Sequence, residues 1–178
     1  AMALAHEGVA LRAIDKAAEK FGMPMGPIEL ADSVGLDIAQ HVAGILTTAA
    51  PREVPDNDLA SLVDAGNLGR KTGQGYYKWE DGKAVKPPAE GQSVPDDIED
   101  RLILPMVNEA VACLSEGVVA ADDLLDAGVI FGTGFAPFRG GPINYARQRG
   151  IDDVMASLRS LAERHGDRFN PHEGWSDL

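Results

Sequence analysis

The sequence has a single cysteine, Cys113, among its 178 residues. One thiol cannot form an internal disulfide, and it cannot supply the several thiolates of a zinc or iron–sulfur site. Basic residues are also scarce, because 16 Lys and Arg stand against 28 Asp and Glu and leave a net charge of −12. Such a chain repels nucleic-acid phosphates and anionic membrane surfaces, so we expect neither as a partner.

Long apolar runs are missing as well. Runs such as Leu102–Val107 fall far short of the roughly 18 residues that cross a bilayer, so no membrane span is expected. No stretch has the order of a signal peptide. Hydrophobic residues make up 44% and charged residues 25%, which is typical of a folded domain. These features predict a soluble protein of a reducing compartment, the cytoplasm.

Apolar residues recur at every third or fourth position through most of the chain, which predicts an all-α fold. The expected helices cover residues 1–21 with a Glu-Gly-Val turn inside, 27–35, 37–48, 58–65, 96–117, 121–129, 142–149 and 152–165. Tyr76–Trp79 has aromatic β-propensity and Asp81–Gly82 is typical of a tight turn. We therefore expect one small β-hairpin near residues 76–86. Residues 169–178 are predicted to be irregular.

Two parts of the sequence are similar to each other. Ala1–Val9 aligns with Ala110–Val118, and Met25–Ile28 has a counterpart in Gly140–Ile143. Two helical units of this kind can bury their apolar faces on each other. The similarity predicts two similar helical-bundle repeats packed together. Chance similarity between alanine-rich helices is the alternative.

The segment Pro87–Pro95 is typical of a linker, so we expect the first repeat at residues 1–90 and the second at 91–178. In the second copy, residues 97–109 precede the aligned alanine in the same helix, whereas the first copy starts at that alanine. We therefore expect Ala1 to lie inside a helix whose first turns precede it. The first repeat would then be truncated at its N-terminus, and the chain would be the C-terminal part of a longer protein.

Two glycine-rich stretches invite comparison with nucleotide-binding motifs. Gly69–Gly75 resembles a phosphate-binding loop, but Asp64 stands where that motif requires its first glycine, and no buried strand precedes it. We favour a turn that leads into the hairpin. Gly132–Pro137 begins like a dinucleotide fingerprint, but Pro137 replaces the third glycine. The chain is therefore expected to hold no Rossmann unit.

Catalytic and metal-binding patterns are also hard to assemble. Glu29 and Asp32 share a helix face, but a first-turn glutamate is explained by the positive helix end. The histidines lack the spacing of a metal-binding pair. They are His6, His41, His165 and His172. We expect no catalytic residue and no metal site here. Met23 and Met25 flank Pro24 in a loop, where exposed apolar residues are better candidates for ligand contact.

Three stretches carry a resemblance to a known family: Phe21–Asp37, Gly69–Tyr77 and Arg101–Pro142. The first two resemble motifs in the C-terminal helical domain of L-3-hydroxyacyl-CoA dehydrogenases. The third resembles the repeated copy of that domain in the multifunctional enzymes of fatty-acid β-oxidation. The resemblance covers nearly the whole chain and supports the internal duplication.

The resemblance implies NAD-dependent oxidation of an L-3-hydroxyacyl-CoA to the 3-ketoacyl-CoA. In the family, a Rossmann domain binds NAD and carries a His–Glu pair for general-base chemistry. The helical domain adds an Asn from an Asn-Arg motif at the start of its first helix. That motif would precede Ala1, and Asn108 does not match it. The chain alone is therefore expected to bind no NAD and to be inactive.

The residues that match the family's acyl-facing loop and helix start are Pro24, Met25, Gly26, Pro27 and Leu30. A helix–helix connection without ligand contact is the alternative for them. The implied partners are an acyl-CoA substrate, an upstream Rossmann domain, a second copy in a homodimer and a thiolase subunit. A non-catalytic helical dimerisation or interaction module is the alternative function. A different dehydrogenase with a duplicated helical domain is a third hypothesis.

Overall fold

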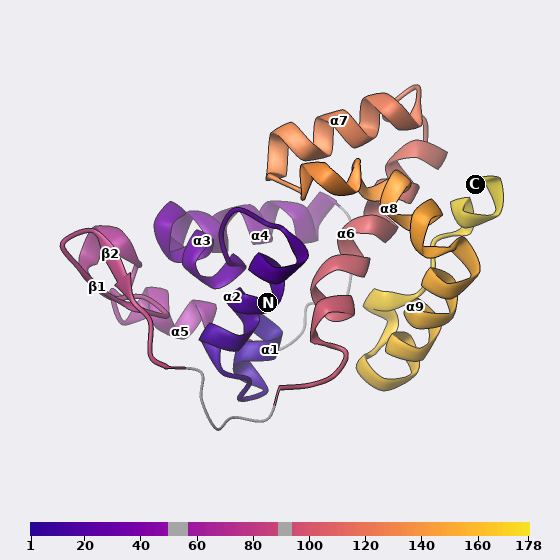
Figure 1. Ribbon diagram of the computed structural model, residues 1–178. Coiled ribbons are helices and arrows are strands. Elements are labelled where there is room, and N and C mark those ends of the chain that lie inside the picture. Colours follow the sequence, from indigo (N-terminus) through magenta and orange to yellow (C-terminus); the bar gives the residue numbers. More distant parts are fainter. Residues whose placement is uncertain (50–56, 89–93) are drawn as a thin grey trace. The chain divides into compact units, whose positions relative to one another are not determined.

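The computed structural model describes residues 1–49, 57–88 and 94–178 (Figure 1). Most of these residues are helical and the described strands form one hairpin, which confirms the expected fold class. The α-helices are α1 (Met2–His6), α2 (Leu11–Phe21), α3 (Pro27–Val34), α4 (Leu36–Ala49), α5 (Leu59–Asp64), α6 (Ile98–Ser115), α7 (Asp122–Thr133), α8 (Pro142–Arg149) and α9 (Ile151–His165). The shorter 3-10 helices are η1 (Arg70–Thr72), η2 (Pro137–Arg139), η3 (Asp167–Phe169) and η4 (Glu173–Asp177).

The chain divides into two compact units. Unit 1 comprises residues 1–20 and 25–96, and unit 2 comprises residues 21–24 and 97–178. The boundary expected between residues 90 and 91 lies outside the described residues. No helix in the described part of the chain is long and apolar enough to cross a membrane.

Unit 1 places α1 to α5 around a small apolar core. Leu4, Ile14, Ile28 and Leu36 come from four different helices, and each is at most 2% exposed. Leu4, Ile14 and Ile28 are apolar positions that the helical spacing predicts, whereas Leu36 lies just before the expected helix 37–48. The turn between α1 and α2 is made by Gly8, whose φ of +88° favours glycine. This turn is the one expected within residues 1–21.

The hairpin of unit 1 forms where the aromatic segment predicts it. Strands β1 (Lys78–Glu80) and β2 (Lys83–Val85) pair antiparallel. The residues of the turn, Asp81 and Gly82, have φ values of +49° and +74°. Positive φ at both positions matches the right-handed twist of the strands, which explains the Asp-Gly pair. The expected hairpin near residues 76–86 is therefore confirmed.

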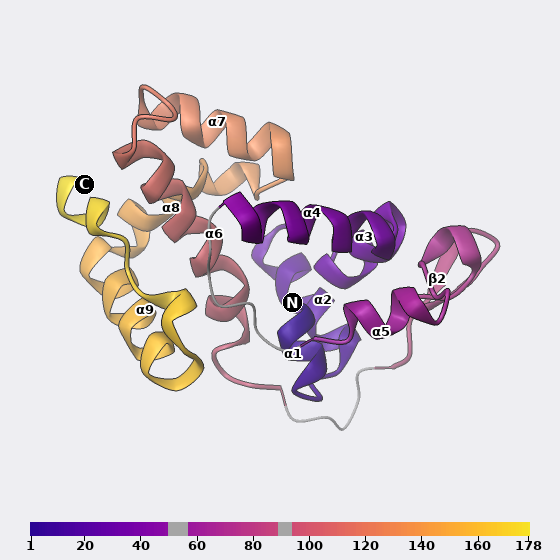
Figure 2. The same ribbon diagram turned by 180° about the vertical axis from the view of Figure 1, so that it is seen from behind.

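Unit 2 is built on α6, which runs unbroken across its internal proline and packs against α8, α9, η3 and η4. Its C-terminal segment returns to α6 (Figure 2). Asn108 of α6 holds this segment: its Oδ1 accepts hydrogen bonds from His172 N (2.9 Å) and Trp175 Nε1 (2.7 Å). Phe169 and Trp175 belong to the core. Residues expected to be irregular thus complete the interior of unit 2.

Candidate functional site

The loop between α2 and α3 ends on a buried carboxylate. Asp15 is fully buried, and its Oδ1 accepts a hydrogen bond from Ile28 N (2.8 Å). Its Oδ2 accepts from Glu29 N (3.3 Å) and from the Tyr77 hydroxyl (2.9 Å). The two amides belong to the first turn of α3, where N–H groups have no partner within the helix. Asp15 therefore fixes the position at which α3 begins.

The electrostatics of Asp15 reflect two opposed effects. Burial raises the pKa of this carboxyl above its ordinary value, while the bonds from Ile28 N and Tyr77 act in the opposite direction. The positive end of α3 also favours the charged form. Tyr77, in turn, has a raised pKa because it is buried and lies beside Asp15. Asp15 serves as an acceptor for α3 and Tyr77, and it faces no open space.

Two of the predicted site residues are explained by this carboxylate. A Cβ atom at Gly26 would lie 2.1 Å from Asp15 Cγ, so the loop backbone reaches its position only with glycine. Pro27 occupies the first turn of α3, where its missing N–H costs nothing and its fixed φ suits the helix. Gly26 and Pro27 therefore shape the loop.

The other predicted site residues expose their side chains. Met25 is 36% exposed and Leu30, on α3, is 48% exposed. Leu30 shares a helix face with Val34, four residues further along, which is also half exposed. Pro24 is exposed and belongs to unit 2. Met25 and Leu30 thus offer apolar surface beside a loop that Asp15 holds rigidly.

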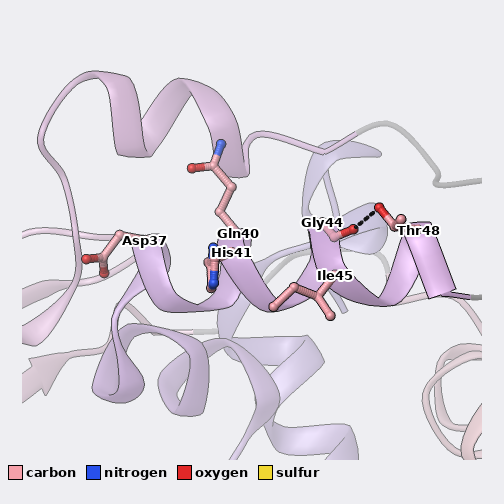
Figure 3. A pocket seen from close by; sticks show the side chains of 6 residues that line it. All are labelled: Asp37, Gln40, His41, Gly44, Ile45 and Thr48. Atoms are coloured by element: carbon pink, nitrogen blue, oxygen red, sulfur yellow. Dashed lines mark hydrogen bonds between the residues drawn. The ribbon is translucent and has the colours of Figure 1, made fainter.

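Helix α4 continues this apolar character. Ile38, Val42 and Ile45 follow the spacing of one helix face and are about half exposed. An open hollow of about 830 Å³ runs along α4, and Figure 3 shows the residues that line it. These are Asp37, Gln40, His41, Gly44, Ile45 and Thr48. All six come from one helix, and Lys71 of η1 forms an ion pair with Asp37 at one end of the hollow. The hollow offers no converging set of catalytic groups.

The glycine-rich loop before the hairpin encloses a carboxylate and holds no phosphate cradle. Asp32 is fully buried and accepts hydrogen bonds from Tyr76 N (2.9 Å), Tyr77 N (2.8 Å) and Trp79 Nε1 (3.1 Å). A Cβ atom at Gly75 would lie 2.3 Å from Asp32 Oδ1. Within the loop, the amides of Gly69, Thr72, Gly73 and Gly75 donate to backbone carbonyl oxygens, as they do in a turn. The turn interpretation is therefore correct.

Glu29 and Asp32, the two acids that share a helix face, have different partners. Glu29 forms an ion pair with Lys86, whereas Asp32 holds the hairpin. His6 contacts Asp58 (2.9 Å) and His165 contacts Asp97 (3.1 Å), so these histidines take part in separate hydrogen-bonded contacts. In the described part of the chain, no three His, Cys, Asp or Glu side chains are placed to hold a metal ion.

Unit 2 repeats the Asp15 arrangement. Asp126 of α7 accepts hydrogen bonds from Ile143 N (2.8 Å) and Asn144 N (3.0 Å) at the start of α8. A Cβ atom at Gly141 would lie 2.4 Å from Asp126 Cγ, and burial raises the pKa of this carboxyl as well. An aspartate thus holds a Gly-Pro-Ile helix start in each unit. The sequence alignment did not single out either aspartate, because the second copy has two extra residues between its Glu-Gly-Val turn and Asp126.

A dinucleotide does not fit the described residues. The described strands pair antiparallel in one hairpin, so no parallel strand leads into a glycine turn and helix. Gly134, within the fingerprint-like stretch Gly132–Pro137, is the left-handed residue that ends α7. The next residue, Phe135, is fully buried in the core. This stretch is a helix end, and no step of NAD chemistry can be assigned to it.

The first part of the chain is similar to a known domain family. Residues 1–79 match the family described as 3-hydroxyacyl-CoA dehydrogenase, C-terminal domain. This part of the chain is therefore similar to that domain. The stretch matched by the 3-hydroxyacyl-CoA dehydrogenase C-terminal domain includes the α2–α3 loop, both buried aspartates of unit 1 and the start of the hairpin.

Relatives match almost the whole chain. The fatty acid oxidation complex subunit alpha of Vibrio vulnificus is 38% identical over 171 residues, which cover 90% of this chain and 24% of the relative. The subunit of the same name from Colwellia psychrerythraea is 41% identical over 184 aligned positions, covering 92% of this chain and 25% of the relative. The chain thus spans about a quarter of the length of these relatives.

Solved structures show the same fold. A 3-hydroxybutyryl-CoA dehydrogenase from Escherichia coli K12 matches with a TM-score of 0.80 at 20% identity, over 98% of this chain and 55% of that protein. The dehydrogenase part of multifunctional enzyme 1 from C. elegans matches with a TM-score of 0.68 at 23% identity, over 96% of this chain and 42% of that protein. The family match and these relatives confirm the expected resemblance to a 3-hydroxyacyl-CoA dehydrogenase C-terminal domain, and the solved structures share its fold.

Proposed function

We propose that this chain is the C-terminal, substrate-side part of an NAD-dependent L-3-hydroxyacyl-CoA dehydrogenase of fatty-acid β-oxidation. The parent enzyme oxidises the 3-hydroxyl of the acyl chain to a ketone and reduces NAD. The chain itself contributes an acyl-binding surface and assembly contacts, and it is inactive alone. The observation that carries this proposal is the family match over residues 1–79, which contains an apolar loop held rigidly against Asp15.

Within this proposal, the five candidate residues have two roles, contact with the acyl chain and control of the loop backbone. Met25 and Leu30 contact the acyl chain, because their side chains are apolar and exposed. Pro24, Gly26 and Pro27 set the path of the loop that presents them. Contact with an apolar ligand would bury surface that water now covers, and each buried methylene contributes about 0.8 kcal/mol. Longer acyl chains should therefore depend more on these residues.

The redox chemistry belongs, in this proposal, to residues that precede this chain in the parent enzyme. Residues 1–79 match a C-terminal domain, and a dinucleotide does not fit the described residues. We place NAD on an upstream Rossmann domain, which holds the general base. We also read the two units as copies of one repeat, the first at residues 1–90 and the second at 91–178. The cytoplasmic location expected from the sequence stays a prediction.

The test compares acyl chains of different length in the intact enzyme. Leu30→Ala removes apolar contact area, so the KM for a long-chain 3-ketoacyl-CoA should rise about tenfold and that for acetoacetyl-CoA much less. Leu124→Ala is the matched control, because Leu124 is 60% exposed and lies in unit 2. Equal KM values for wild type and Leu30→Ala on every chain length would contradict acyl contact. Turnover by the isolated 178-residue chain would contradict the placement of the chemistry.

A second candidate function, helical assembly, is favoured by exposed apolar side chains. Phe131 is 90% exposed and Leu46 is 62% exposed. Large apolar groups in water favour association, so we propose that the chain forms a homodimer and that a thiolase subunit is a further partner. Sedimentation over a range of concentrations tests this. A monomer at every concentration would contradict self-association and leave the acyl contact unaffected.

A further inference from the structure

Both ends of the hairpin in unit 1 are attached to α3. Tyr77, which directly precedes β1, donates its backbone N–H to Asp32 Oδ2 (2.8 Å). Lys86, which directly follows β2, forms an ion pair with Glu29 in the first turn of α3. Leu30 lies in the sequence between Glu29 and Asp32. The hairpin therefore holds α3 on both sides of one of the candidate acyl-contact residues.

Tyr77 connects α3 to α2 as well. Its hydroxyl donates a hydrogen bond to Asp15 Oδ2 (2.9 Å), and the residue is only 2% exposed. Asp15 belongs to α2 and Asp32 to α3, so a single buried residue bonds a carboxylate on each helix. Side chains in a close-packed interior have little room to move. Tyr77 therefore helps to fix how α2 and α3 lie relative to each other within unit 1.

The carboxylate of Asp15 is in direct contact with the backbone that precedes α3. A Cβ atom at Gly26 would lie 2.3 Å from Asp15 Oδ1, the oxygen that accepts the bond from Ile28 N. A rotation of this carboxylate would therefore displace Gly26 and, with it, the preceding residue Met25. The bond from the Tyr77 hydroxyl to Oδ2 opposes that rotation, because a hydrogen bond weakens steeply as its angle departs from the preferred range. Tyr77 thus acts on Met25 through Asp15.

Unit 2 begins α8 in the same way without such a tyrosine. In the described part of unit 2, the hydrogen bonds to Asp126 come from Ile143 N and Asn144 N. Asp126 also lines an open hollow of about 380 Å³. Two amide donors are thus enough to hold a helix start of this kind. The third donor, Tyr77, occurs in the unit that carries the candidate acyl-contact residues, so its role goes beyond starting the helix.

We propose that Tyr77 is a positioning residue for the acyl-contact side chains of Met25 and Leu30. Through Asp15 it holds the loop at Met25. Through Asp32 it sets the rotation of α3 and therefore the direction in which Leu30 points. Tyr77 itself is buried and touches no acyl chain. This proposal rests on the proposed function, because that function gives Met25 and Leu30 their ligand.

The first experiment follows unit 1 without any substrate. The full chain is labelled with ¹³C-methyl methionine and ¹⁵N-tryptophan, and its spectra are compared for wild type, Tyr77→Phe and Tyr76→Phe. The Met25 methyl group reports on the loop, while the indole N–H of Trp79 reports on the attachment of the hairpin to Asp32. Tyr76→Phe is the matched control, because the buried hydroxyl of Tyr76 has no hydrogen-bond partner in the described part of the chain.

The expected result is a Met25 methyl resonance that shifts in Tyr77→Phe alone. The Trp79 indole resonance should stay in place in all three proteins, because the backbone of the hairpin keeps its bonds to Asp32. An unchanged Met25 resonance in Tyr77→Phe would overturn the positioning role. So would an equal change at Trp79, since the Tyr77 hydroxyl would then support the whole hairpin.

The second experiment measures kinetics in the intact enzyme. Tyr77→Phe should raise the KM for a long-chain 3-ketoacyl-CoA about fivefold and leave kcat nearly unchanged, because the loss of one hydrogen bond misplaces the acyl contacts before binding. Tyr76→Phe should match wild type. In a Leu30→Ala background the effect of Tyr77→Phe should be smaller, because one of the contacts that Tyr77 positions is already gone. An equal rise in KM in both backgrounds would contradict positioning through Leu30.

The two experiments separate this proposal from the proposed function. If Leu30→Ala raises KM while Tyr77→Phe does not, the acyl contact stands and the positioning role is wrong. If Leu30→Ala has no effect, the acyl contact is wrong, and the Met25 resonance still decides whether Tyr77 holds the loop.

Discussion

Replacing Gly26 with alanine tests the contact that places the start of α3. Gly26 has φ −69° and ψ 149°, which alanine adopts without strain, so the substitution changes only the space beside Asp15. The added methyl group would lie 2.1 Å from Asp15 Cγ, a distance at which the carboxylate must move. The side chain of Asp15 is fully buried, so it cannot move into solvent.

The magnitude follows from the hydrogen bonds that a displaced carboxylate would lose. Asp15 accepts from Ile28 N, Glu29 N and the Tyr77 hydroxyl. Each such bond contributes about 1 kcal/mol net, and a buried donor left without a partner costs about 1–3 kcal/mol. Alanine also restricts the unfolded chain more than glycine does, which stabilises the folded state by about 0.4–1 kcal/mol and offsets part of the loss. We therefore expect Gly26→Ala to lower the free energy of unfolding of unit 1 by about 2–4 kcal/mol.

The assay uses the two tryptophans of the chain, because each unit contains one: Trp79 lies in unit 1 and Trp175 in unit 2. In a Trp175→Phe background, fluorescence during urea unfolding reports unit 1 alone. Gly44→Ala is the matched control, since nothing lies within 4 Å of a Cβ atom at this position of α4. It should leave unit 1 unchanged or more stable by about 0.5–1 kcal/mol.

A double variant tests whether Gly26→Ala destabilises unit 1 through its contact with Asp15. Asp15→Ala removes the carboxylate with which the new methyl group collides, so Gly26→Ala should add almost nothing in that background. Additive losses would show that Gly26 acts through some other contact. A single Gly26→Ala loss below about 0.5 kcal/mol would refute the collision itself.

Two further predictions concern buried polar groups. Asn108→Ala removes three hydrogen bonds to the C-terminal segment, so Trp175 fluorescence should report a loss of about 2–4 kcal/mol in unit 2; a loss confined to unit 1 would contradict this. The raised pKa of Asp15 means that the folded state binds its proton more tightly than the unfolded chain does. Its contribution to stability is therefore complete below the ordinary value of 3.8 and falls as the pH rises through the raised pKa. Wild type should lose stability relative to Asp15→Asn as the pH rises above the ordinary value of 3.8, and parallel curves would argue against the shift.

In both units, a buried aspartate accepts hydrogen bonds from the first turn of a helix. Asp15 and Asp126 each hold a helix start whose preceding residue is a glycine packed on the carboxylate. The loops that follow α2 and α7 differ, however, and only the longer one carries Arg139.

Much of the fold was predictable from the sequence because it depends on local chemistry. Apolar spacing places the buried faces of the helices, and Asp81–Gly82 supplies the backbone conformation that the hairpin turn requires. Gly-Pro-Ile marks the start of α3 and of α8, since proline suits a first helical turn. The motifs around these elements were also enough to indicate the family.

The roles of several polar residues depended on contacts that no local pattern contains. Asp32 meets the hairpin 44 residues further along the chain, and Asn108 meets the C-terminal segment more than 60 residues away. Arg139 reaches back 118 residues to Phe21. A side chain of this kind has a definite partner only after the backbone has folded.

The sequence alone determined which segments become helix or hairpin and which family the chain resembles, because propensity and spacing act between near neighbours. Only the tertiary structure decided that Asp15 is an acceptor for α3, that residues 21–24 belong to unit 2, and that Met25 and Leu30 remain exposed. Burial and hydrogen bonding over long sequence distances make these assignments, since they depend on where the folded backbone brings each group.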